Sequence, residues 1–253
     1  MRILALDSSG LTASAAILED GALTAEYTVN FRMTHSQTLL PMIDEISRMT
    51  GLEARSLDAV AIAGGPGSFT GLRIGSATAK GIALSADIPV ISVPTVDALA
   101  WNLYGAQGVV CPMMDARRGQ VYTGLYRFRA SESGRGQFRM ETILPQCPLS
   151  AEELADRLNE IGEPVIVLGD GVPVFRELLR EKLRVSWSEA PAHLNRQRAG
   201  AVASLAVSLL CGEPEDGLFR IRHPEYLTPA RDHVPEYLRV SQAERERAQK
   251  NLS

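Results

Sequence analysis

The chain has 253 residues, 45% of them hydrophobic, with three cysteines and a formal net charge of −4 at pH 7. This length is enough for one large domain or two modest ones, and the acidic balance excludes a broad basic surface that neutralises many phosphates of a nucleic acid. The cysteines form no C-x-x-C pair, which argues against a disulfide framework or a zinc site and favours a cytoplasmic protein, and no apolar run predicts a signal peptide or a membrane span.

The first hundred residues predict a β-meander and then alternating helices and strands. Turn residues after Asp7 and around Gly21 separate three β-like segments. Apolar residues at helical spacing predict two helices, of which the first ends at Gly51. The expected elements are three strands within residues 1–30, a helix over 36–50, a strand over 57–63, a helix over 72–85 and a strand over 90–93.

A glycine-rich stretch, GGPGSFTGLRIG at residues 64–75, follows the strand expected at 57–63. So many glycines around a proline indicate positive φ or very close backbone approach. Amides beside a helix N-terminus suit an anion, but the spacing matches neither the P-loop nor the dinucleotide-binding fingerprint. A strand-to-helix turn with tight helix packing is therefore the favoured interpretation.

The second half of the chain repeats the pattern of the first. A meander begins near Val109 with an acidic turn at Asp115, and Ser150 with Glu153 forms a capping box for a helix that ends at Gly162. A strand and a turn follow at 165–171. The repetition indicates an internal duplication in which Asp7 and Asp115 are equivalent.

This duplication resembles the actin-like (ASKHA) proteins, which include actin, sugar kinases and Hsp70. The predicted fold class is α/β, with duplicated βββαβα domains in two lobes that face a cleft. The expected division is an N-terminal domain at 1–106, a C-terminal domain at 107–194, a late helix at about 195–212 that packs back on the first domain, and a Pro-rich charged tail at 213–253. We expect the terminal residues 241–253 to be solvated.

An actin-like fold would bring two turns of the chain to the phosphates of a nucleotide. The candidate residues of this cleft are Asp7, Ser8, Asp115, Gly169, Asp170 and Gly171. Aspartate and glycine also suit tight turns without any ligand, and the glycine loop itself, which precedes the helix expected at 72–85, carries no basic residue. We therefore expect a vestigial cleft and no bound cofactor, although Arg117 and Arg118 would offer a phosphate fork.

Several motifs spread over nearly the whole chain resemble the TsaB (YeaZ) family: LALDSS, HSQTLLPMID, GGPGSFTGLRIG with AKGIA, PMMDARRGQVY and PEYLR. The resemblance implies an actin-like subunit without catalysis of its own. Such a subunit binds and activates a paralogous catalytic subunit, TsaD, and an ATPase, TsaE, joins them. The complex modifies adenosine 37 to threonylcarbamoyladenosine in tRNAs that read codons beginning with A, so contact with tRNA would be indirect. The isolated subunit would form a homodimer.

The histidines agree with this expectation. The resemblance implies that the catalytic relative holds a metal with an H-x-x-x-H pair, in which both imidazoles share one helix face. The histidines here are His35, His193, His223 and His233, and no two have that spacing. We expect no metal, and we interpret His35 as a surface or capping residue. A peptidase, which needs a nucleophile and a base, is the least favoured function.

Small residues at every fourth position indicate a docking face on the second helix. Methionines on the first helix would adapt to more than one partner. The expected interface residues are Leu39, Met42, Ile43, Ile46, Met49, Gly71, Leu72, Gly75, Ala79 and Ile82. The alternative is that this face packs on the sheet of its own domain. If it is an interface, Gly75→Leu is expected to block assembly and leave the monomer folded.

A second function stays open on the sequence alone. The chain is then an independent actin-fold ATPase or phosphotransferase, in which Asp7 and Asp115 position a metal and phosphates. Titration of the isolated chain with Mg-ATP distinguishes the two functions.

Overall fold

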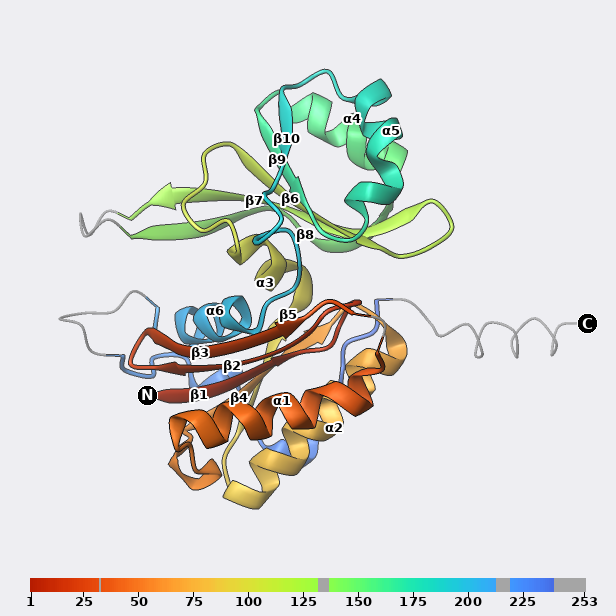
Figure 1. Cartoon of the computed structure of the whole chain (residues 1–253). Coiled ribbons are helices and arrows are strands. Elements are labelled where there is room, and N and C mark those ends of the chain that lie inside the picture. The colour runs from red at the N-terminus through yellow and green to blue at the C-terminus, as the bar shows by residue number, and fades with distance from the viewer. Residues whose placement is uncertain (32, 132–136, 213–218, 239–253) are drawn as a thin grey trace, which may run out of the picture.

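The computed structural model describes residues 1–31, 33–131, 137–212 and 219–238. The chain forms two lobes, one above the other in Figure 1, and each lobe is built on one mixed sheet. Lobe I holds a six-stranded sheet in the order β11-β5-β4-β1-β2-β3, and lobe II a five-stranded sheet in the order β10-β9-β6-β7-β8. In both sheets an antiparallel meander continues into parallel strands, as the internal duplication predicts.

Lobe I is a three-layered unit. Its strands are β1 (Arg2–Asp7), β2 (Ala13–Glu19), β3 (Ala22–Val29), β4 (Ala59–Gly65), β5 (Val90–Pro94) and β11 (Leu227–Thr228). Helices α1 (His35–Thr50) and α2 (Phe69–Ala86) lie side by side on one face, and α6 (Ala199–Cys211) covers the other (Figure 1). Alternate residues of the buried strands point to opposite faces. Two apolar cores therefore form, one on each side of the sheet.

Lobe II repeats this plan with helices on its outer face. Its strands are β6 (Val109–Asp115), β7 (Gln120–Ala130), β8 (Phe138–Ser150), β9 (Val165–Leu168) and β10 (Trp187–Glu189). Helices α4 (Ala151–Ile161) and α5 (Val172–Lys182) pack on the side away from lobe I (Figure 1). Helix α3 (Thr95–Trp101) lies between the lobes and contacts strands of both. The described residues also form three short 3-10 helices, η1 (Ala54–Ser56), η2 (Pro224–Tyr226) and η3 (Ala230–Asp232).

Local sequence signals explain where several helices begin and end. Ser150 accepts a hydrogen bond from the Glu153 amide at 3.1 Å and caps α4, and Gly51 and Gly162 end their helices with φ of 67° and 71°. Helix α2 begins earlier than expected, at Phe69, because the Ser68 hydroxyl accepts from the Gly71 amide and caps it there.

The late helix α6 contacts β1, β2 and β4 of lobe I. Residues 224–238 do not form a separate tail: β11 pairs with β5 at the sheet edge, and η3 packs against α2. The stretch 241–253, expected to be solvated, lies outside the described residues. Within the described ranges, no helix has the length and apolar character needed to cross a membrane.

Candidate functional site

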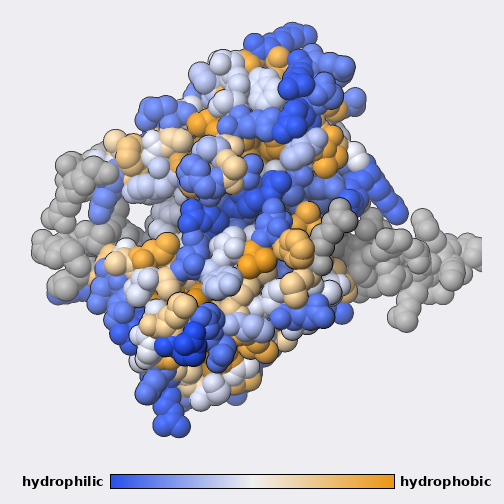
Figure 2. Space-filling model, viewed as in Figure 1, coloured by the Kyte–Doolittle hydropathy of each residue, from blue (hydrophilic) through white to orange (hydrophobic). Residues whose placement is uncertain are grey.

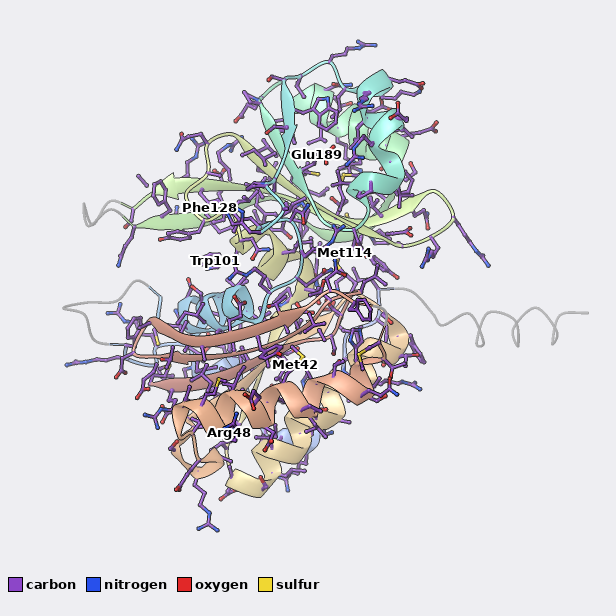
Figure 3. The ribbon with its side chains drawn as sticks, in the orientation of Figure 1. Met42, Arg48, Trp101, Met114, Phe128 and Glu189 are labelled. Carbon is purple, nitrogen blue, oxygen red and sulfur yellow. The ribbon has the colours of Figure 1, made fainter. Side chains whose placement is uncertain are left out.

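A cavity of about 570 Å³ lies between the two lobes. Lobe I contributes the turn after β1 and the glycine-rich turn before α2, and lobe II contributes the end of β6 and the turn after β9. Met114, which lines the cavity, is labelled at the boundary between the lobes in Figure 3. Figure 2 shows mainly hydrophilic surface along this boundary.

Asp7 and Ser8 stabilise the turn on the lobe I side of the cleft. The Asp7 side chain is 1% exposed, and its Oδ1 accepts hydrogen bonds from the amide and the hydroxyl of Ser9, at 2.9 and 2.6 Å. Burial raises the pKa of Asp7 to about 6. The Ser8 hydroxyl donates to the Gly71 carbonyl at 2.8 Å and ties the turn to α2. Neither side chain lines the cavity, so both are positioning residues of the turn.

Asp115 and Asp170 face the cavity from lobe II. The Asp170 Oδ1 accepts from the Asp115 amide at 3.1 Å, and Asp115 pairs with the exposed Arg117 guanidinium at 3.1 Å. Burial raises the pKa of Asp170. Gly169 and Gly171 flank Asp170 but pack against the backbone of β6: a Cβ at Gly169 would meet the Met113 carbonyl at 2.2 Å. These glycines allow close backbone approach and do not line the cavity.

His35, at the start of α1, contacts the turn after β1 in lobe I. Its Nε2 lies 2.9 Å from the Gly10 carbonyl, so the half-buried ring holds the turn after β1 at the start of α1. Among the described residues, no group of three or more His, Cys, Asp and Glu side chains could hold a metal ion.

The structure adds residues to the cleft that the sequence analysis did not place there. Glu236, Tyr237 and Leu238 line the cavity, and the Tyr237 ring packs on Phe69 with centroids 4.9 Å apart. The PEYLR stretch was noted only as part of a family resemblance, and its residue pattern carries no signal for a contact with the glycine-rich turn.

Most of the residues expected at an interface are buried inside lobe I, and this corrects the predicted docking face. A Cβ at Gly75 would meet Ser8 Oγ at 2.3 Å and Ile62 Cδ1 at 3.0 Å, and a Cβ at Gly71 would meet the Ser8 carbonyl at 2.1 Å. The other members in the lobe I core are Leu39, Met42, Ile43, Ile46, Leu72 and Ala79. Figure 3 shows Met42 between α1 and the sheet. The small residues allow close approach of α2 to its own lobe; the alternative stated above is the one observed.

The opposite side of α2 carries a different set of residues. Of the expected interface residues, Met49 is 72% exposed and Ile82 is half-buried. The outward face of α2 begins with the exposed Arg73 and continues at helical spacing through uncharged residues. We call this uncharged part the outer stripe, and it consists of Ile74, Ala77, Thr78, Gly81, Leu84 and Ser85. Leu84 is 59% exposed, and nothing lies within 4 Å of a Cβ built at Gly81. The sequence pattern that could have indicated this stripe is the run of uncharged residues at helical spacing on the side of the helix opposite Gly75 and Ala79.

Comparison with known proteins finds similar sequences along most of the chain. The family model described as "TsaD: tRNA N6-adenosine threonylcarbamoyltransferase" matches residues 31–245. The tRNA threonylcarbamoyladenosine biosynthesis protein TsaB of Bacillus subtilis is 30% identical over 244 residues, 96% of each chain. Its Escherichia coli namesake is 34% identical over 184 residues, which cover 72% of this chain and 76% of the relative.

A solved structure of the same family also matches this chain in fold. The structure of YeaZ from Pseudomonas aeruginosa superposes with a TM-score of 0.72 at 27% identity and covers 94% of this chain and 99% of that chain. The predicted α/β fold in two lobes of like topology is confirmed. By sequence over nearly its whole length and by fold, this chain belongs to the TsaB (YeaZ) family.

Proposed function

We propose that this chain is a non-catalytic subunit in the synthesis of tRNA threonylcarbamoyladenosine. It pairs with a TsaD-type catalytic subunit and, together with a TsaE-type ATPase, supports modification of adenosine 37 in tRNAs that read codons beginning with A. The isolated chain forms a homodimer through the surface that would otherwise bind the TsaD-type subunit. Its contact with tRNA is indirect and is made through the complex. Support comes from relatives named for this biosynthesis and from a family model described by the transferase itself.

The outer stripe of α2 is the observation that carries this proposal. It is mostly exposed, has no charged side chain and repeats at spacings of three and four residues, as a helix–helix contact requires. Gly81 leaves open space at its centre where another helix backbone can approach. We expect a paralogous subunit to present two helices equivalent to α1 and α2. Packing of those two helices on α1 and α2 of this chain would form a four-helix interface centred on the outer stripe.

Reconstitution with the TsaD-type and TsaE-type subunits of the same organism tests the proposal. We expect Ala77→Glu, which adds a charge to the outer stripe, to weaken binding of the TsaD-type subunit by at least about tenfold, because the carboxylate must lose its water in the interface. Formation of modified adenosine should fall in parallel. The matched control is Thr142→Glu on β8 of lobe II, where the native side chain is likewise exposed and lies outside the cleft.

A third variant separates the helix surface from the cleft. Asp115→Ala should reduce modification less than Ala77→Glu does, since Asp115 belongs to the cleft wall. Two results would contradict the proposal: unchanged binding of the TsaD-type subunit to the Ala77→Glu chain, or turnover of Mg-ATP by the isolated chain at an enzymatic rate. The second result would instead support an independent actin-fold ATPase.

A further inference from the structure

The C-terminal strap, which we define as residues 233–238, leaves the edge of lobe I and enters the cleft. Its beginning is fixed on α2: the Lys80 ammonium donates to the carbonyls of Arg231 and His233, at 2.9 and 3.0 Å. The His233 side chain is 3% exposed. The chain therefore reaches the cleft from a well-anchored position.

Backbone contacts place the strap directly on the glycine-rich turn. The Glu236 amide donates to the Gly64 carbonyl at 2.7 Å. A Cβ at Gly65 would lie 2.1 Å from the Glu236 carbonyl oxygen, so the strap approaches closer than any side chain at that position would allow. Gly65 also has a φ of +130°, a region that L residues rarely adopt. One role of this glycine is thus to accept the strap.

Side chains of the strap extend the contact to α2 and to lobe II. The Tyr237 ring packs on Phe69, its hydroxyl accepts from Arg73 Nε at 3.3 Å, and the Arg73 guanidinium lies 3.9 Å from the centre of the Phe69 ring. On the other side, Gln146 of β8 donates to the Glu236 carboxylate at 3.2 Å. The strap therefore touches both lobes at the mouth of the cleft.

The chemistry that the strap brings into the cavity is a carboxylate and an aromatic ring. These groups share one cavity with residues 66–69 of the glycine-rich turn, with the exposed Arg117 and with Asp170. A ligand that carries an anionic group and a ring would compete for the same walls. We propose that the C-terminal strap is an intramolecular occupant of the cleft, and that a ligand of this chemical class reaches the glycine-rich turn only when Tyr237 and Glu236 leave it.

Mg-ATP is a suitable probe, because it combines anionic groups with an aromatic base. The full-length Tyr237→Ala chain loses the contacts to Phe69 and Arg73, so the strap is released more often, and affinity rises with the fraction of open cleft. We expect Tyr237→Ala to bind Mg-ATP at least about tenfold more tightly than wild type in calorimetric titration. Tyr226→Ala is the matched control, since Tyr226 and Tyr237 are both 39% exposed and Tyr226 lies outside the cleft.

Hydrogen exchange of the Glu236 amide reports on the strap directly. Exchange should be faster in Tyr237→Ala than in wild type and in Tyr226→Ala, and Mg-ATP should accelerate it in wild type, because the coupling between two occupants is reciprocal. Three results would overturn the proposal: unchanged exchange in Tyr237→Ala, faster exchange without tighter binding, or binding of Mg-ATP to wild type while the Glu236 amide stays protected.

Discussion

The two lobes repeat one topology but cover their sheets in different ways. Helix α5 of lobe II packs on its sheet with large side chains, Val172, Phe175 and Leu179. Helix α2 of lobe I turns mostly small residues inward, among them Gly71 and Gly75, and so lies close to the turn after β1. A duplicated fold thus keeps its order of elements, while the size of the inward side chains sets how closely each helix approaches.

The outer surfaces differ as well. Helices α4 and α5 expose ion pairs, Arg157 with Glu153 at 2.9 Å and Arg180 with Glu177 at 2.8 Å. Such exposed pairs contribute little to stability but keep a surface solvated. The outer stripe of α2 has no charge at all. Helix α1 of lobe I also exposes an ion pair, Arg48 with Glu45 at 2.7 Å, so the contrast with lobe II is confined to the outer stripe, the surface to which the proposed function assigns the partner.

The largest effect is expected from filling the inward side of α2. Gly75→Leu places a side chain where Ser8 and Ile62 already lie, and overpacking of this kind should lower the free energy of unfolding by about 3 kcal/mol. Urea unfolding measures it, and Ala77→Leu, on the exposed side of the same helix, is the control with an expected change below about 0.5 kcal/mol. A Gly75→Leu chain as stable as wild type but unable to assemble would restore the original interface assignment.

The paired aspartates extend the comparison to the cleft. Asp7 is buried under its turn, whereas Asp115 pairs with the exposed Arg117 at the cavity wall. Because burial raises the pKa of Asp7 from 3.8 to about 6, the folded chain holds a proton there that the unfolded chain has already lost. The free energy of unfolding should therefore fall as pH rises from about 4 to about 6, and Asp7 should add no further slope above that range.

Asp7→Asn isolates this contribution. Between about pH 4.5 and pH 7, wild type should lose about 2 kcal/mol relative to the variant, since each unit of pKa difference is worth about 1.4 kcal/mol. Urea unfolding of both chains at several pH values measures the difference. Parallel curves for the two chains would mean that Asp7 is not the buried carboxyl that the structure describes.

Local chemistry made much of the fold predictable, and tertiary contacts account for what was not. The cap at Ser150, the stops at Gly51 and Gly162 and the equivalence of Asp7 with Asp115 all follow from neighbouring residues. Small residues spaced by four indicate a close contact of α2 but do not say with which neighbour. The position of the strap is harder still to predict, because Glu236 and Gly64, which form a hydrogen bond, lie far apart in the sequence. No local residue pattern indicates such a long-range contact.

The smallest expected effect lies on the outer side of α2. Gly81 sits inside a helix with nothing within 4 Å of a Cβ at that position. Gly81→Ala reduces the conformational freedom of the unfolded chain and should raise the free energy of unfolding by about 0.5–1 kcal/mol, measured with urea on the dilute isolated chain. A decrease would mean that the added methyl group meets a neighbour absent from a single chain. The outer stripe of α2 would then already be covered by another molecule in solution. Lobe I would differ from lobe II by having a permanent interface, not by having a surface that is free until a partner binds.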